Sequence, residues 1–140
     1  MDLGVLKEAL SDNKIRELGA LELAYIGDTV YDLYVRSYLV KGQMGKVQKL
    51  HKKAIGVVNA KAQAQAARLI LAELNERESE IFRYGKNAKS TPPKNMSKED
   101  YRLATGLEAV IGYLYLTGQT DRLDYVMSRI IEHFFIKQRG

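Results

Sequence analysis

The sequence predicts an all-α protein with a single domain. Apolar residues recur at the spacing of one helical face along most of the chain, and no segment alternates between apolar and polar residues as a strand does. The 140 residues are 46% hydrophobic and 28% charged, which is typical of one globular domain. We therefore expect residues 1–140 to form one domain of about seven helices around one core.

The N-terminal part predicts two helices. The first covers about residues 2–10 and ends before Ser11-Asp12-Asn13, because these side chains favour turns over helix interiors. The second covers about residues 17–40, where apolar side chains recur every three or four residues. The positions of this apolar stripe are Leu23, Ile26, Val30 and Leu33.

Three further helices are expected at about residues 47–54, 58–74 and 76–85, the last of them ending at Gly85 as helices commonly do. Residues 86–95 then form a loop, because they contain both prolines of the chain. The loop holds three lysines and no acid, so we expect it to present a cationic surface.

Two helices complete the predicted bundle. Ser97 is a predicted N-cap, and acids follow it in the first turn at Glu99 and Asp100, which complements the helix dipole. This helix should run to about Leu116, and the final helix should cover about residues 121–136.

Composition limits the classes of site and partner. The chain has no cysteine, which excludes disulfides and thiolate-bound metals, so any metal would be held by oxygen or by the two histidines. No apolar run approaches the roughly 20 residues that cross a bilayer. The N-terminus also lacks the pattern of a signal peptide, so we expect a cytoplasmic protein.

Positive charge is concentrated in the middle of the chain. The net charge is +5, yet residues 41–102 alone contain 14 Lys and Arg against 6 Asp and Glu. That segment has a net charge of +8, and the remainder of the chain has −3. Such segregation favours a surface that binds a polyanion.

Two glycines and two acids stand inside predicted helices. Gly27 and Gly112 each cost roughly 0.5–1 kcal/mol relative to alanine, and close contact between two helices would offset that cost. Asp28 follows one glycine and Glu108 precedes the other by four residues, both in apolar sequence. If the helices cross at their glycines, the two carboxylates can converge and hold Mg²⁺ together with water. Ion pairs with Lys or Arg, or exposure to solvent, would also explain these acids.

The segments around these acids resemble the two motifs of the ribonuclease III family. Residues 23–28, Leu-Ala-Tyr-Ile-Gly-Asp, with the Thr-Val-Tyr-Asp that follows, are similar to the family signature. Residues 107–116 are similar to its distal metal-binding helix. The segments 50–53, 59–61 and 83–95 are typical of the Mini-ribonuclease III branch, a catalytic domain without a double-stranded RNA-binding domain. The resemblance spans nearly the whole chain and implies the helical ribonuclease III-type endonuclease fold.

This resemblance implies a magnesium-dependent endoribonuclease, with Mn²⁺ as a substitute, that cuts double-stranded RNA and leaves 5′-phosphate and 3′-hydroxyl ends. Asp28 and Glu108 match the family's catalytic, metal-binding acids. The implied role is maturation of the ends of 23S (large-subunit) ribosomal RNA in ribosome biogenesis, by a homodimer, with a ribosomal protein as a further partner. Duplex RNA is read mainly through its backbone, so we expect RNA contacts from lysine and polar side chains. The candidates are Lys52, Lys53, Lys61, Lys86, Asn87, Lys89 and Lys94.

Three acids of the larger family members are missing, because Leu21, Ala24 and Thr105 stand in their places. Asp32, one helical turn after Asp28, could face the same site or form a salt bridge. The missing acids keep a second interpretation open, that of a catalytically inactive, helical RNA-binding assembly factor. A third is a basic helical DNA-binding module, although no turn between short helices resembles a recognition motif.

Overall fold

The computed structural model describes residues 3–136, and every regular element in that range is helical. The predicted all-α class is therefore confirmed. Within the described range, none of the helices combines the length and the hydropathy that a bilayer span needs. The α-helices are α1 Gly4–Lys7, α2 Asp12–Arg16, α3 Ala20–Lys41, α4 Val47–Val58, α5 Ala60–Ile70, α6 Glu76–Lys86, α7 Lys98–Leu116 and α8 Thr120–Ile131, with a 3₁₀ turn at Leu71–Glu73 and a π-helical turn at Glu132–Ile136.

Several helix boundaries differ from the prediction, since α1 covers only Gly4–Lys7 and α8 ends at Ile131. Two further differences have the same physical reason. The expected turn after residue 10 is instead the start of α2, because Ser11 accepts a hydrogen bond from the Lys14 backbone N–H at 3.3 Å. Asn59 separates α4 from α5, since its side-chain oxygen accepts from the Ala62 backbone N–H at 2.9 Å. The helix expected from about residue 58 therefore begins at Ala60, and α4 continues to the residue before the cap. Side chains that favour turns are also the preferred N-caps.

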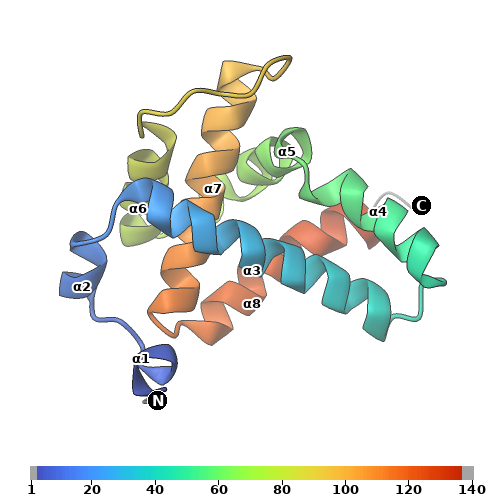
Figure 1. Ribbon diagram of the computed structural model, residues 1–140, viewed down its shortest axis with the longest axis horizontal. Helices are drawn as coiled ribbons and strands as arrows, with labels where there is room; N and C mark the ends of the chain where they lie inside the picture. The colour runs from blue at the N-terminus through green and yellow to red at the C-terminus, as the bar shows by residue number, and fades with distance from the viewer. Residues whose placement is uncertain (1–2, 137–140) are drawn as a thin grey trace.

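The two long helices α3 and α7 cross in the middle of the molecule (Figure 1). α7 begins at its predicted cap, because Ser97 accepts from the Asp100 backbone N–H at 3.2 Å. α5 and α6 pack against α7, and α4 packs against α3. The crossing therefore brings together two segments that lie about 80 residues apart in the sequence.

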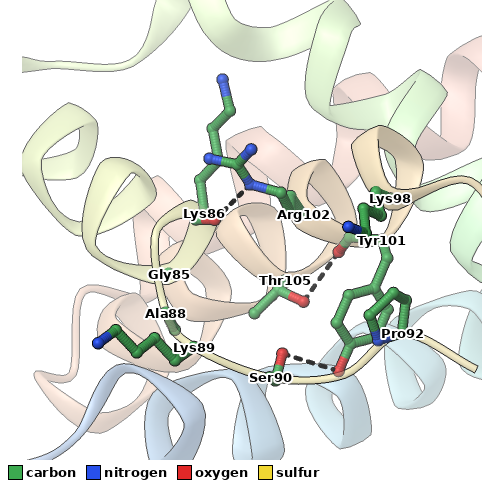
Figure 2. A pocket seen from close by; sticks show the side chains of 10 residues that line it. All are labelled: Gly85, Lys86, Ala88, Lys89, Ser90, Pro92, Lys98, Tyr101, Arg102 and Thr105. Carbon is green, nitrogen blue, oxygen red and sulfur yellow. Dashed lines mark hydrogen bonds between the residues drawn. The ribbon is translucent and has the colours of Figure 1, made fainter.

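The connection from α6 to α7 is the predicted loop, and hydrogen bonds fasten it to α7 (Figure 2). Ser90 Oγ donates to the Tyr101 hydroxyl at 3.2 Å. Arg102 donates from Nε to the Lys86 carbonyl at 3.1 Å and from a terminal nitrogen to Asn87 Oδ1 at 3.2 Å. The base of the loop is thus held in place by one arginine of α7.

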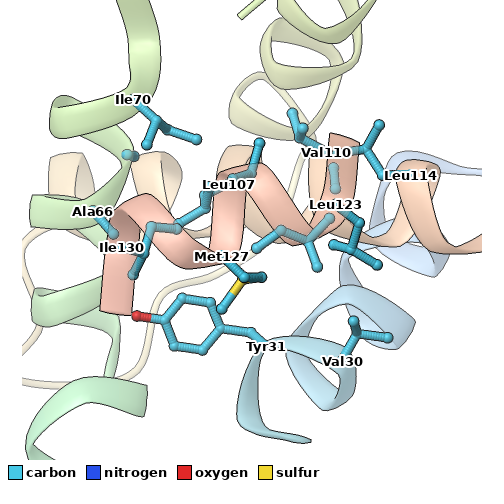
Figure 3. Close-up of a cluster of buried hydrophobic side chains, with 14 of the residues drawn as sticks. Val30, Tyr31, Ala66, Ile70, Leu107, Val110, Leu114, Leu123, Met127 and Ile130 are labelled. Atoms are coloured by element: carbon cyan, nitrogen blue, oxygen red, sulfur yellow. The ribbon is translucent and has the colours of Figure 1, made fainter. Parts of the chain in front are cut away.

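The core lies where α3, α5, α7 and α8 meet (Figure 3). Leu33, which the prediction places in the apolar stripe of α3, is 63% exposed, and Tyr31 is buried in the core instead. The Tyr31 hydroxyl is satisfied there, because it donates to the Val57 carbonyl at 2.8 Å. Burying a large apolar side chain stabilises the fold by about 1.5–3 kcal/mol. The side chains that Figure 3 labels in this core are Val30, Tyr31, Ala66, Ile70, Leu107, Val110, Leu114, Leu123, Met127 and Ile130.

Candidate active site

The crossing of α3 and α7 depends on two glycines. A Cβ atom added to Gly27 would lie 1.7 Å from the Glu108 carbonyl oxygen, and one added to Gly112 would lie 2.0 Å from the Leu23 carbonyl oxygen. Any larger residue would force the two backbones apart. The close helix contact that the sequence predicts at these two glycines is therefore present. The two helices therefore approach more closely here than side chains would permit.

This close approach brings the carboxyl groups of Asp28 and Glu108 into hydrogen-bonding contact. Asp28 is exposed to solvent, whereas Glu108 is partly buried. Burial, together with the neighbouring Asp28 carboxylate, raises the pKa of Glu108 to about 9. Within residues 3–136, neither acid forms a salt bridge with Lys or Arg, so the ion-pair alternative does not describe them. Two carboxyl groups therefore meet at this point, and within the described residues neither is paired with a cationic side chain.

A third side chain, that of Gln63, comes from α5. It is 3% exposed, and its Nε2 donates a hydrogen bond to Asp28 Oδ1 at 3.3 Å. It also hydrogen-bonds to Glu108. This hydrogen bond lowers the pKa of the Glu108 carboxyl group, but burial raises that pKa by more. The sequence analysis missed this residue. The available signal was a glutamine on the alanine-rich face of a helix, where an apolar residue is expected.

The three positions that lack the acids of larger family members do not supply ligands. Ala24 is buried, and Leu21 is 43% exposed. Thr105 is buried, and its hydroxyl donates to the Tyr101 carbonyl of its own helix at 2.9 Å. Asp32, which could have faced the site, instead accepts from Arg36 Nε at 2.6 Å. Across the part of the chain that the structure describes, no three acidic or histidine side chains gather to hold a metal.

The predicted RNA-binding residues lie in two groups. On α4 and α5, Lys52 and Lys61 are exposed, and the Lys53 ammonium donates to the Met44 carbonyl at 3.2 Å. Between α6 and α7, Lys86 and Lys89 line a pocket of about 240 Å³ (Figure 2). In the same region, Asn87 accepts from Arg102, and Lys94 is exposed on the loop.

This pocket contains two basic residues that the sequence analysis did not select, Lys98 and Arg102. Both belong to the first turns of α7, four residues apart, so they lie on one face of that helix. That spacing, directly after a cationic loop, is the signal that could have found them. The pocket therefore gathers cations from the end of α6, the loop and α7.

An open apolar groove lies along the first turns of α3. It is lined by residues of the α2–α3 connection, the first turns of α3 and the end of α7. Tyr25 is 82% exposed in this groove, the largest exposed fraction of any large hydrophobic residue in the described chain. The lining residues are Leu18, Leu21, Glu22, Tyr25, Ile26 and Leu116, which we call the Tyr25 groove.

The chain is similar to known proteins of one family. The family model for the ribonuclease III domain matches residues 21–119. The chain is 45% identical over 128 residues to Mini-ribonuclease 3 of Clostridium tetani, covering 90% of this chain and 85% of that protein. It is 42% identical over 123 residues to Mini-ribonuclease 3 of Staphylococcus aureus, and the match covers 86% of this chain and 92% of that protein.

A crystal structure of a Fusobacterium nucleatum protein superposes with a TM-score of 0.77 at 33% identity, covering 85% of this chain and 96% of that one. The family match includes all of α7 and all of α3 except its first residue, and these are the two helices that carry Asp28 and Glu108. The chain therefore belongs to the ribonuclease III family of endoribonucleases, with Mini-ribonuclease 3 proteins among its relatives.

Proposed function

We propose that this chain is a magnesium-dependent endonuclease of double-stranded RNA in which Asp28 and Glu108 hold the metal. One observation carries the proposal: two carboxylates from remote segments meet at a helix crossing with no protein cation between them. A partly buried carboxyl group beside a second carboxylate normally holds a proton or a metal ion. The family acts on double-stranded RNA, which fits a chain whose basic residues are concentrated in one segment.

The donor set fits a hard cation. Both donors are carboxylate oxygens, and their combined charge of −2 balances the +2 of one divalent ion. Mg²⁺ commonly keeps several waters, which would complete its coordination. When bound there, Mg²⁺ supplies Lewis-acid activation of a water and charge neutralisation at the phosphate. Glu108 must give up its proton for this purpose, because its raised pKa keeps the carboxyl group neutral at pH 7 in the metal-free protein. Mn²⁺ has the same ligand preference and should substitute for Mg²⁺.

The basic pocket supports the binding of an RNA backbone. Lys86, Lys89 and Lys98 line one concave surface together with Arg102, and phosphates are the expected ligands of such a basic surface. Lys52 and Lys61 offer further exposed charge on α4 and α5. Duplex recognition through phosphates and 2′-hydroxyls needs such lysines rather than stacking aromatics.

We further propose that the active form is a homodimer joined at the Tyr25 groove. One active site cuts one strand, so cleavage of both strands needs two sites. The Tyr25 groove is an apolar surface next to Gly27 and Asp28 on the same helix, so a two-fold contact there would set two active sites near one duplex. Tyr25 itself is of the residue type that is enriched at protein interfaces.

The biological role that fits this proposal is maturation of 23S ribosomal RNA ends in the cytoplasm, with a ribosomal protein assisting substrate binding. The similarity to the Mini-ribonuclease 3 proteins supports this role. A precursor duplex that contains the 23S ends should be cut at discrete positions, whereas a duplex of the same length and unrelated sequence should be cut elsewhere or more slowly. Equal rates and scattered cuts on both duplexes would contradict this substrate.

The decisive test uses a labelled RNA duplex of about 30 base pairs with Mg²⁺ or Mn²⁺. Asp28→Asn and Glu108→Gln should each reduce the cleavage rate by at least about 10³-fold, because a metal-bound water and its charge supply much of the rate enhancement. Both variants should retain duplex binding. Asp32→Asn is the matched control on the same helix, and it should cleave like the wild type because Asp32 is paired with Arg36. No cleavage by the wild-type protein at any concentration of either metal would favour the RNA-binding assembly factor instead.

A further inference from the structure

Gln63 is a buried polar residue on a helix that otherwise supplies small apolar side chains to the core. Ala62, Ala64, Ala66 and Ala67 are each no more than 5% exposed, which lets α5 pack closely against α7. Burying an amide without hydrogen bonds costs roughly 2–7 kcal/mol, so an amide at such a position needs partners. The partners of Gln63 are Asp28 and Glu108, the two acids of the proposed active site.

The amide matches the needs of these two carboxylates. Its nitrogen carries two N–H donors, and a carboxylate group has two oxygens, each of which accepts hydrogen bonds. A donor that occupies one oxygen leaves the other oxygen of the same carboxylate for a cation. Each of the three central helices thus contributes one side chain: α3 gives Asp28, α7 gives Glu108 and α5 gives Gln63.

Neutrality is the second advantage of an amide at this position. When both acids are ionised, as metal binding requires, a third acid would bring the charge at the crossing to −3, whereas Gln63 supplies donors and leaves it at −2. A leucine would pack against the alanines but would leave both carboxyl groups without a donor from α5. Only a neutral donor both fills the space and fixes two negatively charged groups.

We propose that Gln63 is a positioning residue that holds Asp28 and Glu108 in the arrangement that binds the divalent metal. This inference rests on the proposed function, since it assigns the partner that orients the two metal-binding acids. Side chains that hydrogen-bond to metal ligands commonly contribute 10- to 100-fold to metal affinity.

The test measures metal binding directly in the RNA-free protein. Gln63→Met keeps the length and approximate volume of the side chain and removes both N–H donors. We expect this substitution to raise the Kd for Mn²⁺ by about 10- to 100-fold. Electron paramagnetic resonance of the free Mn²⁺ ion measures that Kd. Gln65→Met is the matched control, because Gln65 lies on the same helix and is exposed, and its Kd should stay at the wild-type value.

Kinetics separate positioning from RNA binding. At saturating metal, Gln63→Met should lower kcat while leaving the KM for the RNA duplex unchanged, because Gln63 is buried and contacts the acids rather than the surface. Gln63→Asn keeps the amide but shortens its reach by one methylene, so its Kd for Mn²⁺ should fall between those of the wild type and Gln63→Met. Far-ultraviolet circular dichroism identifies a variant that does not fold, and Gln63→Asn then takes the place of Gln63→Met.

Two outcomes distinguish failure of this inference from failure of the proposed function. If Asp28→Asn and Glu108→Gln lose Mn²⁺ binding while folded Gln63→Met and Gln63→Asn bind like the wild type, Gln63 is merely a packed polar residue and the positioning role is wrong. If Asp28→Asn and Glu108→Gln also bind Mn²⁺ like the wild type, the metal site itself is wrong.

Discussion

Glu108 couples the stability of the metal-free protein to pH. In the folded state, burial and the Asp28 carboxylate raise its pKa to about 9, whereas an unfolded glutamate titrates near pH 4.3. The neutral form is therefore favoured in the folded state. Its contribution to stability is complete below the unfolded pKa and is lost as the pH rises through the folded pKa. A bound divalent ion reverses this preference, because it requires the charged form of Glu108.

We expect the free energy of unfolding in the presence of a chelator to fall between about pH 5 and pH 9. For one proton, the slope is at most about 1.4 kcal/mol per pH unit. Urea denaturation at a series of pH values measures this slope. Subtracting the free energy of unfolding of Glu108→Gln at each pH removes the titration of all other groups. Saturating Mg²⁺ should abolish the difference in slope between the two proteins. A wild-type curve parallel to that of Glu108→Gln in chelator would show that Glu108 is ionised without metal.

The crossing of α3 and α7 is the feature that creates the site, and it can be tested at its glycines. Gly27→Ala places a methyl group 1.7 Å from a backbone oxygen of α7, a distance that only movement of a whole helix can relieve. We expect a loss of about 1–3 kcal/mol or more in the free energy of unfolding. The Kd for Mn²⁺ should also rise, because the two acids separate.

Gly56→Ala is the control for this prediction. Gly56 lies inside α4, and nothing stands within 4 Å of an added Cβ atom. The same substitution should therefore stabilise the protein by about 0.5–1 kcal/mol through helix propensity alone. Equal effects of the two substitutions in urea denaturation would contradict the close contact between α3 and α7.

The connection between α6 and α7 is expected to contact RNA phosphates. Lys86→Gln and Lys98→Gln should each reduce the dependence of the logarithm of affinity on the logarithm of salt concentration by about one unit, since each removes one phosphate contact. Fluorescence anisotropy with an RNA duplex measures this slope in an Asp28→Asn background. Lys14→Gln on α2 should leave it unchanged, because Lys14 lies outside the pocket and pairs with Glu17. An unchanged slope in all three variants would exclude the pocket from the RNA interface.

Local signals predicted most of the elements and one part of the site. The cap at Ser97 and the prolines after Ala88 fixed the start of α7 and the loop before it, because caps and prolines act on neighbouring residues. The mid-helix glycines, Gly27 and Gly112, predicted the crossing, because their cost implies a close contact. Both signals can be read within a few residues of sequence.

Contacts between remote residues could not be predicted in this way. The Gln63 amide contacts Asp28 across 35 positions of sequence. Helical spacing puts Gln63 on the face of Ala66 and Ala67, but it does not identify the partner of the amide. Glu78 is 1% exposed and accepts from Arg122 Nε at 2.8 Å, although four of the first five residues of α6 are charged and such residues are usually exposed. Pairings of this kind follow from how the helices pack, which helical periodicity does not determine.

At the level of the whole molecule, the described residues form a basic pocket between α6 and α7 and an apolar groove at Tyr25. A second copy of the chain is the partner that we propose for this groove. Tyr25 is the main support for this dimer, because its side chain is 82% exposed and a second copy would bury that apolar area.

Tyr25→Arg should convert a dimer into a monomer, because it places a charge, and a second one by symmetry, at the centre of an apolar contact. Analytical ultracentrifugation measures the change in mass, and circular dichroism should show an unchanged fold since Tyr25 is not part of the core. Leu33→Arg is the control, being a 63% exposed residue of the same helix outside the groove, and it should remain dimeric. The monomer retains Asp28, Glu108 and Gln63, so it should bind Mn²⁺ with the wild-type Kd but cut both strands of a duplex far more slowly. A wild-type protein that is monomeric at micromolar concentration, or a Tyr25→Arg variant that stays dimeric, would place the second active site elsewhere.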